Sequence, residues 1–138
     1  KDLFAKKEFK NFVYIDLKKD DEARDFFATT SNAEKYLGYI EARYGKKITE
    51  NVPLIFDEVQ QCHQVLSALK YFKQDYPELP VIATGSMVRL SIKHEESRAR
   101  GGKKDEFLFP VGAIDSLNVY PLNFEEYLLN TNKILLQK

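Results

Sequence analysis

Two neighbouring carboxylates follow an apolar run in the middle of the chain. The run is Val52-Pro53-Leu54-Ile55-Phe56, and Asp57 and Glu58 come directly after it. A continuous apolar run is typical of a strand covered on both faces, and ligands bind at the carboxyl ends of strands in open parallel sheets. Asp57 would hold a hydrated Mg²⁺ there, and Glu58 would polarise a water molecule. The alternative is a turn whose two acids are solvated or cap the next helix.

A second polar group follows another short apolar run later in the chain. Thr84 and Ser86 come shortly after the apolar residues 81–83. A helix-length segment separates this run from Asp57, as in one right-handed strand–helix–strand crossover. The crossover would bring both hydroxyl groups to the edge that carries the two carboxylates. They would contact a γ-phosphate or the attacking water there, unless they only close a turn at a polar strand end.

The elements that must position these residues are predicted from the apolar pattern. Strands are expected at residues 12–15, 52–56 and 81–83 and near 117–120. Helices are expected over 1–9 and 20–27, between 31 and 45, from about 60 to before Pro77, and from 123 through 128. Strands that alternate with helices predict an α/β fold with a mostly parallel sheet, in one domain over residues 1–138.

Two of these helices carry start signals. Ser31 and Glu34 have the spacing of a capping box, and Gly45 is expected to end that helix. Asn123 and Glu126 have the same spacing at the start of the last helix. Between the third and fourth predicted strands, residues 87–108 are polar and basic without a sustained period, which predicts a surface loop.

Composition excludes several classes of protein. The chain has 138 residues, is 43% hydrophobic, and balances 21 Lys and Arg against 21 Asp and Glu. It is therefore too apolar for a disordered tail and has no global field that favours nucleic acid or an anionic membrane. The single cysteine, Cys62, and the histidines His63 and His94 lack the spacing of a zinc site. A chain without a disulfide framework or an 18-residue apolar run fits a cytoplasmic location with no membrane contact.

Four motifs together resemble a known family. Leu54-Ile55-Phe56-Asp57-Glu58-Val59-Gln60 is similar to a Walker B motif, and Ala83-Thr84-Gly85-Ser86 is similar to the sensor-1 strand end of AAA-type ATPases. The later Pro110-Val111-Gly112 and the run Tyr120-Pro121-Leu122-Asn123-Phe124-Glu125-Glu126-Tyr127-Leu128 are similar to a narrower group. That group is the prokaryotic AAA-like ATPases in which the nucleotide-binding domain precedes a separate C-terminal domain of uncharacterised role.

The resemblance implies a P-loop NTPase-like three-layer fold that binds and hydrolyses ATP with Mg²⁺. Asp57 would hold the metal through water, Glu58 would act as the general base, and Thr84 or Ser86 would sense the γ-phosphate. The chain has no G-x-x-x-x-G-K-[ST] sequence, and Ser97 to Lys104 fits it too poorly to serve. The resemblance therefore places the Walker A loop and a first strand upstream of Lys1. That strand would lie between the third and fourth predicted strands. Because the loop supplies most of the nucleotide affinity, this chain alone is expected to be inactive.

Arg98 and Arg100 are the candidates for an arginine that acts across a homo-oligomer interface on the developing phosphate charge. The alternative is a solvated basic loop, because residues 89–104 carry six basic side chains against two acidic ones. This local excess gives weak support to nucleic acid as a partner. A second function therefore stays open, which is a nucleotide-dependent switch or DNA-associated interaction module with little or no turnover. A degenerate, inactive domain is a third possibility.

Overall fold

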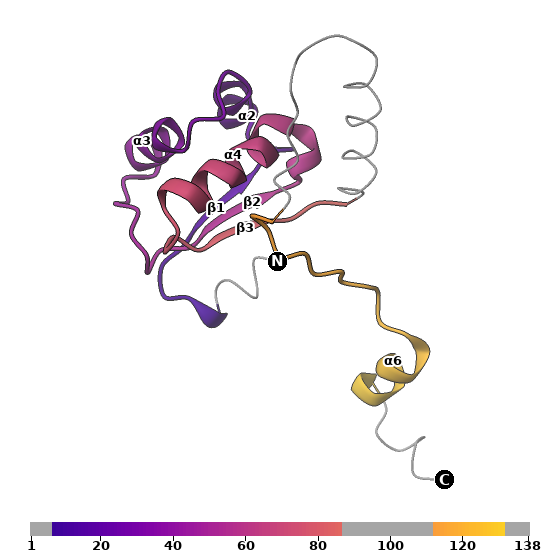
Figure 1. Cartoon of the computed structure of the whole chain (residues 1–138). Coiled ribbons are helices and arrows are strands. Elements are labelled where there is room, and N and C mark those ends of the chain that lie inside the picture. Colours follow the sequence, from indigo (N-terminus) through magenta and orange to yellow (C-terminus); the bar gives the residue numbers. More distant parts are fainter. Residues whose placement is uncertain (1–6, 87–111, 132–138) are drawn as a thin grey trace, which may run out of the picture.

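The computed structural model describes residues 7–86 and 112–131. Its three strands are β1 (Val13–Asp16), β2 (Leu54–Asp57) and β3 (Val81–Ala83), which form a parallel sheet in the order β1-β2-β3 (Figure 1). Asp16 pairs with Asp57, and Phe56 pairs with Ala83. The carboxyl ends of all three strands therefore meet at one edge, and the first three predicted strands are confirmed to within two residues.

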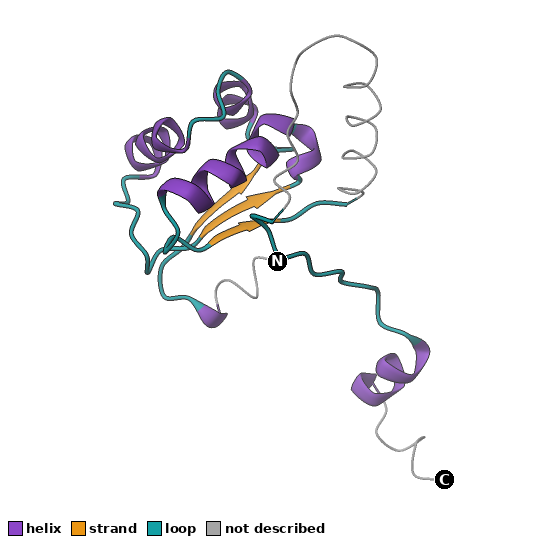
Figure 2. Ribbon diagram, in the orientation of Figure 1, coloured by secondary structure: helices purple, strands orange, loops and turns teal. Residues whose placement is uncertain are grey.

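Helices cover one face of this sheet (Figure 2). They are α2 (Asp21–Ala28), α3 (Ala33–Tyr44) and α4 (His63–Asp75), and a short 3₁₀ helix, η1 (Val59–Gln61), precedes α4. The predicted helix from about residue 60 is thus divided into η1 and α4. The α/β fold with a parallel sheet is confirmed, and this small sheet is compatible with part of a P-loop NTPase-like domain.

The caps explain where the first helices begin and end. The Asp20 carboxylate accepts a hydrogen bond from the backbone N–H of Ala23 and starts α2. Asn32, not Ser31, caps α3 by accepting from Lys35 N–H, so the predicted cap was wrong by one residue. Gly45 ends α3 as predicted, with a φ of 62° that glycine adopts without steric cost.

The core lies between the sheet and its helices. Alternate residues of β1 and β2 face the helices, among them Ile15 and Phe56, and are fully buried. Four aromatic rings pack together there, and these are Phe27, Tyr36, Phe56 and Phe72. The Tyr36 hydroxyl donates to the backbone oxygens of Phe27 and Thr30, each at 2.9 Å, so this buried polar group is satisfied.

The C-terminal segment differs from the prediction. Residues 114–123 form no strand, and Leu117 and Val119 are 88% and 85% exposed, so the fourth predicted strand is wrong. A strand needs a hydrogen-bonded neighbour, and the described residues provide none beside this segment. The final helix is confirmed as α6 (Phe124–Thr131), because Asn123 and Glu126 form the reciprocal capping box.

Some predictions fall on residues that the structure does not describe. The basic stretch, the predicted loop over 87–108, and Arg98 and Arg100 lie outside the described residues. Of the predicted N-terminal helix, residues 7 and 8 are helical and 1–6 are not described. Within the described part of the chain, every helix is too short or too polar to cross a membrane.

Candidate functional site

Asp57 is the centre of the polar cluster at the carboxyl edge of the sheet. Its side chain is 5% exposed, and it is the one charged residue among the buried residues of the described chain. The Thr84 hydroxyl and the backbone N–H of Glu58 donate to Asp57 Oδ1. The Tyr14 hydroxyl donates to Asp57 Oδ2 at 2.5 Å. These donors stabilise a buried carboxylate whose burial would otherwise be costly.

The strand ladder explains why Thr84 reaches Asp57. The backbone N–H of Thr84 donates to the Phe56 oxygen at 2.8 Å, and the Thr84 oxygen accepts from Val59 N–H at 3.0 Å. Backbone pairing thus continues one residue beyond β3 and fixes the Thr84 side chain beside β2. The predicted meeting of Asp57 and Thr84 at one edge is therefore confirmed as geometry.

Glu58 follows Asp57 in an unusual backbone conformation. Its φ of 57° and ψ of 43° are left-handed, which costs a residue with a Cβ about 1 kcal/mol or more. The hydrogen bond from Glu58 N–H to Asp57 Oδ1 and the bond from Val59 to Thr84 hold this turn. The turn reverses the chain directly after β2, so that Glu58 remains at the same edge as Asp57.

Gln60 connects Glu58 with Ser86. The Gln60 side-chain nitrogen donates to Glu58 Oε2 at 2.6 Å and to Ser86 Oγ at 3.3 Å. One amide group therefore joins the carboxylate that follows β2 to the hydroxyl that follows β3. The structure thus brings all four predicted residues to this edge: Asp57 and Thr84 form a direct hydrogen bond, and Glu58 and Ser86 are joined through Gln60.

The chain is similar to a known protein family. A family model described as an AAA domain matches residues 1–128. This chain belongs to that AAA domain family. Neither a curated protein nor a solved structure matches the chain. Membership suggests a nucleotide-binding, ATPase-like domain, and proteins of this family generally bind ATP and Mg²⁺.

Two residues that form contacts at the carboxyl edge of this AAA domain were not predicted from the sequence. Tyr14 lies two residues before Asp16 in β1, so the two side chains lie on the same face of the sheet. This alternation was the available signal. Gln60 lies in the Walker B-like run, but a side-chain amide gives no sign of its partners. Both contacts depend on packing between segments, which spacing alone does not specify.

Asp16 has a local role at the end of β1. Its Oδ1 accepts from the backbone N–H groups of Lys18 and Lys19, and its carboxylate forms an ion pair with the Lys19 ammonium at 3.1 Å. Asp16 is not the cap of helix α2, because the Asp20 side chain caps that helix. Asp16 therefore closes the turn that leads into α2.

Cys62 and His63 lie where η1 meets α4. Cys62 is buried, and this burial raises the pKa of its thiol. A thiol with a raised pKa is a poor nucleophile at neutral pH. Among the described residues there is no cluster of three His, Cys, Asp or Glu side chains that would hold a metal ion.

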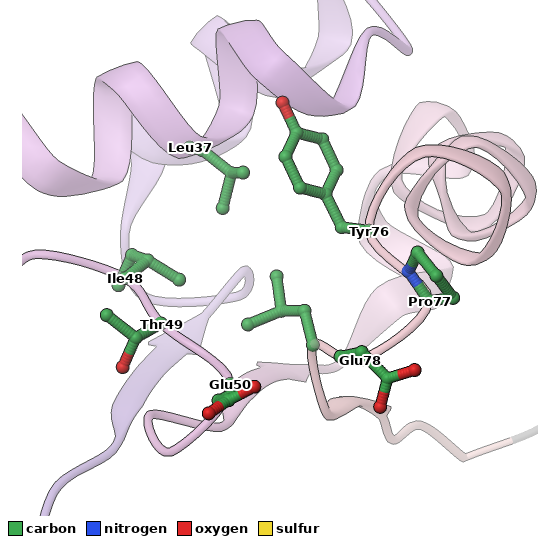
Figure 3. A pocket seen from close by; sticks show the side chains of 8 residues that line it. Leu37, Ile48, Thr49, Glu50, Tyr76, Pro77 and Glu78 are labelled. Carbon is green, nitrogen blue, oxygen red and sulfur yellow. The ribbon is translucent and has the colours of Figure 1, made fainter.

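A pocket lies away from Asp57, at the opposite edge of the sheet. It has a volume of about 330 Å³ and is lined by segments that precede β2 and β3, together with α3. Leu37, Ile48 and Tyr76 point into it, whereas Glu78 turns its carboxylate away (Figure 3). This pocket brings no pair of chemically suited side chains together, so it is not the candidate site.

Proposed function

We propose that this AAA domain binds and hydrolyses ATP at the carboxyl edge of its sheet. The hydrogen bond between Thr84 and the buried Asp57 carboxylate carries the proposal. It joins the strand end that resembles Walker B to the strand end that resembles sensor 1. A buried carboxylate and a hydroxyl beside a strained Glu58 form a polar edge suited to a metal-bound phosphate.

The donor set fits magnesium rather than a metal held by protein ligands alone. Mg²⁺ keeps several of its waters and is bound through one or two carboxylates together with substrate phosphates. Asp57 supplies such a carboxylate, and no cluster of three metal-ligating side chains occurs in the described parts of the chain. When bound, Mg²⁺ would neutralise charge that develops on the phosphate oxygens. Asp57 would contact it through a water molecule.

Glu58 is the proposed general base. Its carboxylate would accept a proton from the water that attacks the terminal phosphate, while the amide of Gln60 fixes one of its oxygens. The hydroxyls of Thr84 and Ser86 would contact the γ-phosphate, and Ser86 would report its presence to Glu58 through Gln60. Each role is carried by a side chain at the same edge of the sheet.

The proposal requires a phosphate-binding loop in addition to these residues. No stretch of the 138 residues has the Walker A pattern. We place that loop, with its lysine and hydroxyl residue, upstream of Lys1, and a separate domain after residue 138. Arg98 or Arg100 would act in trans from a second copy in a homo-oligomer.

The test is ATP turnover by the complete protein carrying Glu58→Gln. Removal of a general base is expected to lower the rate about 10²- to 10⁴-fold while ATP binding persists. The matched control is Glu50→Gln, because Glu50 is exposed and lines the pocket at the opposite edge. Undiminished hydrolysis by Glu58→Gln would refute the assignment of the base.

The hydrogen bond between Gln60 and Glu58 also favours a second candidate function. A carboxylate held by an amide is withdrawn from water, as expected of a nucleotide-dependent switch with little turnover. Such a protein would act through DNA or a protein partner. Binding of DNA and of partner proteins would be compared with ATP, with ADP and without nucleotide. Affinity that changes between the three states, with negligible hydrolysis, would favour the switch.

A further inference from the structure

Tyr14 contacts the Asp57 carboxylate from a different strand and from far away in the sequence. Its hydroxyl donates to Asp57 Oδ2 at 2.5 Å, across 43 residues of chain. Tyr14 pairs in register with Ile55, so Asp57 lies two positions further along β2 on the same face of the sheet. A tyrosine is long enough to span this diagonal, because its hydroxyl is at the far end of the ring.

The donors on Asp57 come from both sides of β2. The Tyr14 hydroxyl, on β1, donates to Oδ2, whereas the Thr84 hydroxyl, next to β3, donates to Oδ1. Donors on both oxygens oppose rotation of the carboxylate about its Cβ–Cγ bond. Loss of the Tyr14 hydroxyl would remove this donor from Oδ2, while the Thr84 hydroxyl and the Glu58 N–H would still donate to Oδ1.

We propose that Tyr14 is a positioning residue that holds the Asp57 carboxylate in the orientation that receives hydrated Mg²⁺. The proposal rests on the ATP site proposed above and adds a residue of β1 to it. A carboxylate that receives a metal through water must present its oxygens in a fixed direction, since the octahedral shell of Mg²⁺ tolerates little distortion. Side chains that orient metal-binding groups in this way change metal affinity about 10- to 100-fold when they are removed.

The test is metal affinity in Tyr14→Phe, which keeps the ring and removes the hydroxyl. Mn²⁺ binding to the complete protein would be followed by electron paramagnetic resonance with a non-hydrolysable ATP analogue. The dissociation constant for Mn²⁺ is expected to rise about 10-fold or more. Binding of the analogue in the presence of a chelator is expected to stay unchanged, because Tyr14 acts on the metal side of the site.

Tyr39→Phe is the matched control. The Tyr39 hydroxyl is buried and has no hydrogen-bond partner among the described residues, so its removal tests the loss of a phenol away from Asp57. Its metal affinity is expected to equal that of the wild type. Equal affinity in Tyr14→Phe would overturn the proposal while leaving the ATP site intact. A wild-type protein that binds no nucleotide, with or without metal, would overturn both.

A second measurement tests the same proposal if the Tyr14→Phe variant does not fold. Site-specific 3-fluorotyrosine at position 14 keeps the hydroxyl and gives a ¹⁹F resonance beside Asp57. The resonance is expected to shift when Mg²⁺ is added to the protein with the non-hydrolysable analogue, and to stay in place with the analogue and chelator. A resonance that does not respond to the metal would overturn the proposal.

Discussion

At the carboxyl edge of the sheet a buried carboxylate accepts hydrogen bonds from both neighbouring segments, whereas the amino edge holds a pocket with mainly apolar walls. At the carboxyl edge, the Asp57 carboxylate accepts hydrogen bonds from Tyr14, Thr84 and a backbone N–H. The amino edge has a pocket of about 330 Å³, and its two acids, Glu50 and Glu78, are exposed. The pocket at the amino edge therefore lacks the converging hydrogen bonds that surround Asp57.

The difference follows from the direction of the strands. Parallel strands present their carboxyl ends together, so polar residues placed just after β2 and β3 meet whatever the space around them. Segments that enter the strands meet at the opposite edge, where half-buried apolar residues such as Leu79 close the core. A functional site is thus recognised by the side chains that converge on it, not by the volume beside them.

The largest expected difference between the two edges is in the free energy of unfolding of two threonine variants. Thr84→Val removes a donor from the buried Asp57 carboxylate, and the free energy of unfolding should fall by about 1.5 to 3 kcal/mol. Thr49→Val, in the exposed rim of the pocket, should change it by less than about 0.5 kcal/mol. Urea denaturation of both variants measures this. Equal losses of unfolding free energy in the two variants would contradict the difference between the edges.

The next contrast lies within the carboxyl edge and compares two glutamines of η1. Gln60→Leu removes the amide that joins Glu58 to Ser86, and ATP hydrolysis by the complete protein should fall about 10-fold. Gln61→Leu changes the exposed neighbour and should leave the rate unchanged. Steady-state turnover measures both. A slower Gln61→Leu with a normal Gln60→Leu would contradict the assigned contact.

At the amino edge, Leu79→Ala should affect stability alone. The half-buried side chain packs against the core, so its truncation should lower the free energy of unfolding by about 1 to 2 kcal/mol. The affinity for ATP analogues should not change, because the pocket lies away from Asp57. Thermal unfolding and analogue titration measure the two effects. Weaker binding at a temperature where the variant is folded would make this pocket part of the site.

The smallest effect at neutral pH concerns the core between the two edges. Burial raises the pKa of Tyr36 well above its ordinary value of about 10. Its contribution to stability is therefore complete below pH 10 and is lost as the pH rises further, because the unfolded chain releases the proton first. The free energy of unfolding should fall above pH 10, and less steeply in Tyr36→Phe. Tyr71→Phe, in an exposed side chain of α4, should keep the steep fall.

Short-range signals predicted much of the fold. The apolar runs gave three strands, and capping residues such as Asn123 gave helix ends, since a cap acts on N–H groups two or three residues away. The strand prediction failed at 117–120, where the apolar side chains Leu117, Val119 and Tyr120 are exposed. A helix end is stabilised within its own segment, but a strand forms only against a partner.

The same difference divides the candidate site. The sequence by itself determined the acids at the end of β2 and the hydroxyls after β3, because residue type and spacing within one crossover place them. Only the tertiary structure decided that Tyr14 and Gln60 complete the network. Those contacts depend on strand register and on side-chain direction across segments, which arise when separate parts of the chain pack together.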